Sequence, residues 1–351
     1  MNKEIDIAFA LLRAAIVGVD KDSPFTSPLS PFTSKDWWSL FRLLQQNHVA
    51  ALTAETVASL DVPREVKIPW LAESEKAERW HRYQREVQTE IIGVMRQHGI
   101  ETLVLKGTHL AEYWPTSETR EFGDLDLYFY DKHEEADRVA REVLKATVSN
   151  DAHHHSKYNY RGVTVESHYD FLNTHYPPSN RRYEVLLKDL VSERQSLPTT
   201  HYPLPTFEIL FLLRHMACHF AASRITLRDL VDWTLTCRTL KDKADWQLVE
   251  KTVADYGMSD FVDALNTIAE QRLGTQPLGH SATQSLMEHD IIYGSVDDRS
   301  GDGLGRLDWK LRRWRALGWK RKMVYNDNAF RLFLASLTSH TMKPQSILHK
   351  Q

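Results

Sequence analysis

Two aspartates separated by a single residue, Asp124 and Asp126, are the side chains whose type and spacing most clearly suggest chemistry. They lie in an apolar run that reads as a β-strand, and residues two apart on a strand point to the same face. Carboxylates held side by side repel each other unless a cation lies between them. Mg²⁺ prefers oxygen ligands and is usually bound by one or two carboxylates together with substrate phosphates. The pair therefore predicts a site for Mg²⁺, or for Mn²⁺ in its place.

Upstream of this pair, Lys106-Gly107-Thr108 follows the apolar strand Leu103–Leu105 and precedes a short helix. A glycine turn at a helix N-terminus has unpaired N–H groups that can bind a phosphate. The lysine is a point charge and Arg120 a bidentate clamp, so both suit a triphosphate. The alternative for Arg120 is a surface arginine paired with Glu118 or Glu121. A phosphate cradle beside a metal-binding carboxylate pair predicts phosphoryl or nucleotidyl transfer.

The order of these residues resembles the polymerase-β-like nucleotidyltransferase superfamily, which has a strand, a glycine-containing turn with a helix, and a strand with Asp-x-Asp. It resembles in particular a branch of uncharacterised nucleotidyltransferases with a Lys-Gly turn and an arginine four residues before the first aspartate. The toxin nucleotidyltransferases of some toxin–antitoxin pairs share this order. Thr108 replaces the superfamily's common serine but keeps a hydroxyl. Phe122 stands where the toxin pattern has a serine, so the resemblance to the toxins is weaker.

This resemblance implies Mg²⁺-dependent transfer of a nucleoside monophosphate from an NTP to an acceptor hydroxyl, with release of pyrophosphate. It also implies a third carboxylate on a neighbouring strand. Glu166 is the best candidate, because Thr164, Glu166 and His168 share one face of the predicted strand Val163–His168. Such a carboxylate would bind a metal and assist deprotonation of the acceptor hydroxyl. The alternative is a glutamate on a solvated face.

The predicted site thus has three catalytic and metal-binding carboxylates and four residues that hold the triphosphate: Asp124, Asp126 and Glu166, and Lys106, Gly107, Thr108 and Arg120. The acceptor is not legible in the sequence; RNA, a protein side chain, a sugar or a small metabolite would all be compatible. The alternative function, from another class, is a non-catalytic nucleotide-binding or interaction protein built on the same fold.

Histidines form two further groups. The run His153–His155 suggests zinc, but three consecutive side chains of a helix or strand cannot converge on one ion, so we interpret it as a polar loop. His215 and His219 lie four residues apart on one helix face, and we interpret them as packed or hydrogen-bonded residues. On the next helix Arg228 and Asp232 predict an intrahelical salt bridge; the resemblance implies a role for this region in closing the nucleotide cleft.

Composition limits the class of protein. The net charge of −3 argues against a surface generally adapted to nucleic acid. The two cysteines, Cys218 and Cys237, are both expected in helices and suit a reducing compartment. No apolar run approaches the roughly 20 residues of a membrane span, and the acidic Glu4 and Asp6 are unlike a signal peptide. We therefore expect a cytoplasmic protein without a membrane partner.

The order of the expected helices and strands along the chain predicts an α+β protein. A small mixed β-sheet core, residues 99–198, is expected between a helical N-terminal region, residues 1–98, and a helical C-terminal domain, residues 199–351. In the core, strands Lys157–Tyr160 and Val163–His168 should form a hairpin through Arg161-Gly162. Residues 274–305 are rich in Gly, Ser and Asp and predict a loop.

A basic segment, residues 306–325, remains open to two interpretations. Its lysines and arginines are interleaved with Trp309, Trp314 and Trp319, a combination that can bind single-stranded nucleic acid through phosphate contacts and stacking. It also suits a helix lying on an anionic surface. We favour a helix packed on the core with its basic residues in water, because its apolar residues have helical spacing: Leu307, Leu311, Trp314 and Leu317.

Overall fold

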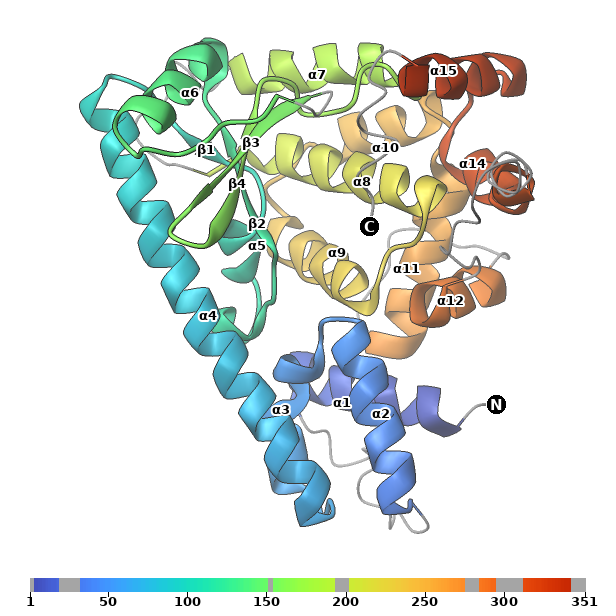
Figure 1. The fold of residues 1–351 in the computed structure, drawn as a ribbon. Helices are drawn as coiled ribbons and strands as arrows, with labels where there is room; N and C mark the ends of the chain where they lie inside the picture. The colour runs from blue at the N-terminus through green and yellow to red at the C-terminus, as the bar shows by residue number, and fades with distance from the viewer. Residues whose placement is uncertain are drawn as a thin grey trace.

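The computed structural model describes residues 3–18, 32–150, 154–192, 202–274, 284–294 and 312–341. Within this part of the chain, helices surround one small four-stranded mixed sheet (Figure 1). The predicted α+β architecture, with a small mixed sheet flanked by helices, is confirmed.

Four helices precede the sheet: α1 (Lys3–Val17), α2 (Ser34–Gln46), α3 (Ala50–Ser59) and α4 (Arg64–Gln97). Thr33 begins α2 with a capping box, in which its side chain accepts from the backbone of Asp36 while the Asp36 carboxylate accepts from the backbone of Thr33. The long α4 runs along one side of the molecule from α3 to the sheet (Figure 1). Its last turns bury Val87, Ile91 and Met95 against the sheet.

The sheet has the strand order β1-β2-β4-β3. Its strands are β1 (Leu103–Val104), β2 (Asp124–Tyr128), β3 (His155–Tyr160) and β4 (Val163–His168). β2 and β4 are parallel, and the other two pairs are antiparallel. Arg161 and Gly162 join β3 to β4 with φ angles of 52° and 80°, and positive φ at both central residues is what a type I′ hairpin turn requires. The predicted hairpin is confirmed, with β3 starting two residues earlier than expected.

The two faces of the sheet differ in polarity, as the alternation of the sequence predicts. Leu125, Leu127, Val163 and Val165 are buried on one face, in a core shared with α4 and α6 (His133–Glu142). The other face carries the aspartates of β2 and the polar residues of β4. The short elements around the strands are α5 (Thr108–Ala111), η1 (Ser117–Thr119) and η2 (Tyr130–Lys132).

The described C-terminal helices follow the sheet in the chain. They are α7 (Asn180–Ser192), α8 (Pro205–Ala222), α9 (Leu227–Leu240), α10 (Trp246–Asp255), α11 (Ser259–Leu273), α12 (Gln284–Tyr293), α14 (Gly318–Val324) and α15 (Ala329–Thr341). Figure 1 shows α8 and α9 across the sheet from α4. The larger hydrophobic core joins residues of the N-terminal helices to these C-terminal helices. The division into three domains stays a prediction.

Two expectations about the C-terminal part need correction. α12 lies inside residues 274–305, which were predicted to be a loop, because Met287, Ile291 and Ile292 are buried there. In the basic segment Leu317 is buried as expected, but Lys320 and Arg321 are buried too and do not face water. Leu307, Trp309 and Leu311 lie outside the described residues. Among the described helices, none combines the length and apolar character needed to cross a membrane.

Candidate nucleotidyl-transfer site

Asp126, Glu166 and His168 form the centre of the site. Asp126 on β2 is in register with Glu166 on the parallel strand β4, and His168 follows two residues later on the same face. One ligand atom from each of the three lies within 4.8 Å of the others. Asp124 lies on the same strand two residues before Asp126, opposite Thr164 and less buried. The sheet therefore brings two of the predicted carboxylates together and adds a histidine to them.

Asp126 is held as a carboxylate although only 2% of its side chain is exposed. The Lys106 ammonium lies 3.0 Å from its Oδ1 atom, and Nε2 of His168 lies 3.2 Å from the same oxygen. Burial by itself would raise the pKa of Asp126, but the charges of Lys106 and His168 outweigh it and lower the pKa well below the usual value. Asp126 is thus a permanent anion at neutral pH.

The pKa of Glu166 is raised, in contrast to that of Asp126. Burial raises its pKa, and the negative charges of Asp126 and Asp124 raise it further. Its Oε1 atom lies 3.2 Å from Nζ of Lys157 and 3.4 Å from Nε2 of His155. Carboxylates that repel each other on one face are a donor set suited to a divalent cation, so Asp126 and Glu166 fit the predicted metal.

The His168 ring faces Asp126 in an orientation that requires positive charge between them. Its Nδ1 atom lies 3.1 Å from the backbone carbonyl of Asp170, which can only accept, so Nδ1 carries a proton. In the neutral ring Nε2 is then a lone pair that faces the Asp126 carboxylate. Two acceptors face each other in this way only if Nε2 is also protonated or a cation lies between them.

The glycine turn at the other end of the site is held by Arg120. Gly107 has a φ of +63°, and a Cβ atom there would lie 3.3 Å from the Phe122 ring, so both the conformation and the space require glycine. Arg120 is 4% exposed and donates from Nη1 to the carbonyl oxygen of Gly107 at 3.0 Å. Its Nε and Nη2 atoms donate to the two carboxylate oxygens of Asp232 at 2.7 and 2.8 Å. The buried arginine therefore joins this turn to α9.

The contacts of Asp232 exclude the alternative for Arg120 and correct the expectation for Arg228. Arg120 is not a surface residue paired with Glu118 or Glu121, because Asp232 comes from a helix far along the chain to meet it. Asp232 consequently does not form the expected salt bridge with Arg228, which lies instead 3.1 Å from Asp229. The direct binding of a triphosphate by Arg120 stays a prediction, and its contacts favour a positioning role.

Lys106 and Thr108, on either side of the glycine, differ in what they offer. Lys106 is 16% exposed and reaches into the site, where its Nζ atom also lies 3.2 Å from Nε2 of His215 on α8. Burial, and then the charge of Lys106, lower the pKa of His215. The Thr108 hydroxyl is buried and donates to Gln88 on α4 at 2.6 Å. The lysine thus belongs to the site, whereas the threonine anchors the turn.

A family model described as an uncharacterised nucleotidyltransferase matches residues 33–274, more than half of the chain. The chain belongs to this family. All seven predicted site residues lie inside the matched range, together with the whole sheet and helices α8 and α9. No curated protein and no solved structure matches the chain. The relationship to the toxin enzymes stays a prediction.

The histidines of the chain differ most from the sequence-based expectation. His155 is not in a polar loop: it begins β3, is 8% exposed, and is in register with His168. His154 lies in the bend just before the strand, and its ring centroid is 4.5 Å from that of His155. His153 lies outside the described residues. The alternation of β4 already placed His168 beside Glu166, but no sequence signal joined His154 to them.

Proposed function

We propose that this protein transfers a nucleoside monophosphate from an NTP to an acceptor hydroxyl and releases pyrophosphate, in a reaction that depends on Mg²⁺ or Mn²⁺. Membership of a nucleotidyltransferase family supports the reaction class. The single observation that carries the proposal is the group of Asp126, Glu166 and His168 within 4.8 Å of one another, with the Lys106 ammonium 3.0 Å from Asp126.

The carboxylates would hold the metal. Asp126 and Glu166, with Asp124 beside them on the same face, provide the oxygen ligands that Mg²⁺ and Mn²⁺ prefer. A bound divalent cation would neutralise charge on the phosphates and favour the alkoxide form of the acceptor. Glu166 would also assist deprotonation of the attacking hydroxyl beside the metal.

The Gly107 turn would bind the triphosphate. Lys106 reaches the metal site from this turn and supplies a positive charge at the point where phosphates would meet the carboxylates. Arg120 fixes the turn through the Gly107 carbonyl, so its contribution to nucleotide binding would be exerted through the backbone of Gly107 and Thr108. We place the reaction in the cytoplasm, a setting consistent with the free thiols of Cys218 and Cys237.

The test is pyrophosphate release from each of the four NTPs in the presence of Mg²⁺ or Mn²⁺ and a cell extract that supplies acceptors. We expect release that depends on both the metal and the extract and that is lost in Asp126→Asn. Metal-dependent NTP binding without pyrophosphate release in any extract would favour the alternative, a non-catalytic nucleotide-binding protein on the same fold.

A further inference from the structure

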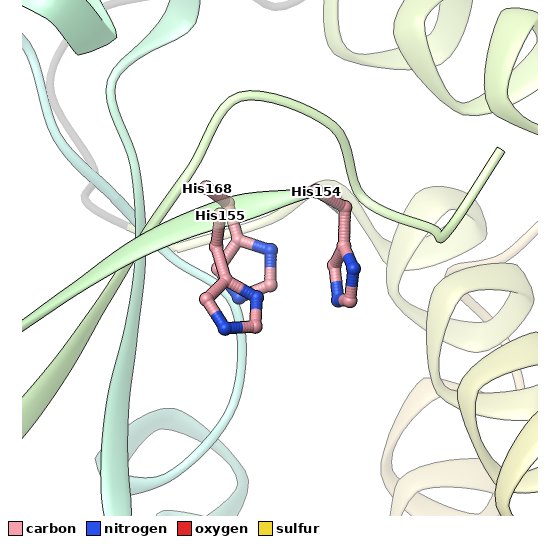
Figure 2. Close-up of side chains that lie close together, drawn as sticks. All are labelled: His154, His155 and His168. Atoms are coloured by element: carbon pink, nitrogen blue, oxygen red, sulfur yellow. The ribbon is translucent and has the colours of Figure 1, made fainter. Parts of the chain in front are cut away.

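Three imidazole rings gather at the open end of the β3–β4 hairpin, opposite the Arg161-Gly162 turn (Figure 2). They belong to His154 in the bend before β3, His155 at the start of β3 and His168 at the end of β4. The ring centroids lie 4.5 Å apart for His154 and His155, 5.1 Å for His155 and His168, and 5.5 Å for His154 and His168. One ring nitrogen from each lies within 4.8 Å of the others.

The cluster is buried and short of hydrogen-bond partners. His155 and His168 are 8% and 3% exposed. The Nδ1 atoms of His154 and His155 are buried, and neither has a hydrogen-bond partner in the part of the chain that the structure describes. A buried polar atom without a partner is unfavourable and uncommon in folded proteins. Two such atoms in adjacent rings indicate a group that the histidines are arranged to meet.

The positions of the rings are fixed by the backbone around them. The carbonyl oxygen of His154 accepts from the backbone N–H groups of Tyr169 and Asp170, both at 3.1 Å, which ties the bend to the end of β4. The Nδ1–H group of His168 donates a hydrogen bond to the carbonyl oxygen of Asp170. A metal-binding histidine typically donates its other ring N–H to a carbonyl or carboxylate in this way.

We propose that His154, His155 and His168 bind a divalent transition-metal ion of the zinc class, next to the carboxylate site. Imidazole nitrogen is a preferred ligand of Zn²⁺ and not of Mg²⁺. Zn–N bonds of about 2.0–2.1 Å place the nitrogens of a tetrahedral site roughly 3.3 Å apart, so the rings need to close by no more than about 1.5 Å from their present 4.8 Å limit. Glu166 or a water would complete the coordination, since its Oε1 atom lies 3.4 Å from His155.

This site would order the hairpin end and remove the Nε2 lone pair of His168 from its contact with Asp126. Its three histidine ligands differ from the carboxylate ligands of the proposed Mg²⁺ site, although Glu166 lies within reach of both, and Zn²⁺ binding is measured without nucleotide. Failure to bind Zn²⁺ would therefore leave the proposed transfer reaction standing, and absence of transfer would leave the Zn²⁺ site standing.

The experiment uses the full-length protein purified without a histidine tag and dialysed against EDTA. Zn²⁺ is titrated by calorimetry with an excess of Mg²⁺ present, because Mg²⁺ prefers oxygen ligands and should not compete for the histidines. We expect one Zn²⁺ per chain, and an affinity at least about tenfold weaker in His154→Gln and in His155→Gln. The control is His98→Gln, which changes an exposed histidine at the end of α4 that lies 2.9 Å from the carbonyl of Val94.

Three results of the Zn²⁺ titration would contradict the proposed site. No stoichiometric Zn²⁺ binding by the wild type, unchanged affinity in both cluster variants, or an equal loss in His98→Gln would overturn the proposal. A measurement that needs no variant is the visible spectrum of the Co²⁺-loaded wild type. Intense bands of four-coordinate Co²⁺ are expected, and the weak bands of six-coordinate Co²⁺ would contradict a site of three histidines and one further ligand.

Discussion

Two buried lysine–aspartate pairs, one among the C-terminal helices and one at the sheet, show how differently this protein uses buried charge. The Nζ atom of Lys320 on α14 lies 2.6 Å from the Oδ2 atom of Asp290 on α12, and both side chains are fully buried. Lys320 also donates to the carbonyl of Ser223 and lies over the Phe220 ring. Among the described residues each is the other's ion-pair partner, and the pair joins α14 to α12.

The pair at the sheet has no such exclusive partnership. Asp126 is shared between Lys106 and His168, while Lys106 is partly exposed and also contacts His215. Glu166 adds a second carboxylate whose raised pKa shows that its charge is not fully compensated. A pair with fixed partners serves stability, whereas a cluster with shared partners and surplus charge is suited to binding. Variants of the two regions should therefore separate stability from activity.

The largest effect is expected in the helical region. Asp290→Ala leaves the Lys320 ammonium buried without a counter-ion, so the free energy of unfolding should fall by about 3–5 kcal/mol. Urea denaturation followed by circular dichroism measures this, and transfer activity per folded molecule should stay unchanged. The matched control is Glu75→Ala, which breaks an exposed pair with Arg79 and should cost no more than about 0.5 kcal/mol. Equal losses in the two variants would contradict a stabilising role for the buried pair.

Glu166→Gln should do the opposite of Asp290→Ala: it should lower transfer activity without lowering stability. We expect transfer to fall by more than about 100-fold, because even the outer partners of metal ligands contribute 10–100-fold. The raised pKa means that the ionised carboxylate is less favourable in the folded than in the unfolded protein, so the neutral amide should leave the free energy of unfolding unchanged or higher. Glu142→Gln, on the exposed side of α6, is the control for both measurements. A destabilised Glu166→Gln variant with normal turnover would reverse the assignment of this region.

Variants of Arg120 and Asp232 test whether one residue can both stabilise the fold and support nucleotide binding. Arg120→Lys keeps a charge for Asp232 but loses the two-pronged contact and the bond to the Gly107 carbonyl, so unfolding should become easier by about 1.5–3 kcal/mol. If Arg120 acts by positioning the turn, Asp232→Asn should raise the KM for NTP in the same way as Arg120→Lys. A KM unchanged in Asp232→Asn but raised in Arg120→Lys would instead indicate direct binding of the triphosphate.

The smallest effect is expected in the basic segment. Arg315→Gln and Lys322→Gln change exposed residues, whereas Lys320 and Arg321 are buried, with the Arg321 guanidinium 3.6 Å from the centre of the Trp314 ring. We expect both substitutions to leave stability and transfer unaffected. Fluorescence anisotropy with single-stranded RNA at several salt concentrations provides the check. Tight binding with a steep salt dependence that these substitutions flatten would establish a nucleic-acid surface.

The features that the sequence predicted depend on residues that are close together in the chain. The features that it missed depend on residues that are far apart. The alternation of Asp124, Leu125, Asp126 and Leu127 predicted which side chains share a face, because the period of a strand is local. The turn at Arg161-Gly162 was equally legible, since its φ angles depend on the residues in the turn. Local pattern was therefore sufficient for the sheet and for one side of the site.

The missed features depend on partners far away in sequence. Arg120 and Asp232 are 112 residues apart in the sequence. The acidic residues closest to Arg120 in the sequence, Glu118 and Glu121, therefore did not predict its partner. His154 and His155 share a side because the bend before β3 breaks the alternation that would otherwise separate them. α12 was hidden by the polar composition of the residues around it, although Met287, Ile291 and Ile292 are buried. Neither a bend nor a distant pairing leaves a periodic signal.

The central claim, that the sheet site transfers a nucleoside monophosphate, is tested most directly by the position of the label in the substrate. Each NTP, labelled at the α- or the γ-phosphate, is incubated with the protein, a divalent metal and cell extract, and the label is then fractionated. We predict that the α-label becomes covalently attached to an acceptor while the γ-label leaves as pyrophosphate, and that Asp126→Asn does neither. Attachment of the γ-label instead, or undiminished α-labelling by Asp126→Asn, would contradict the claim.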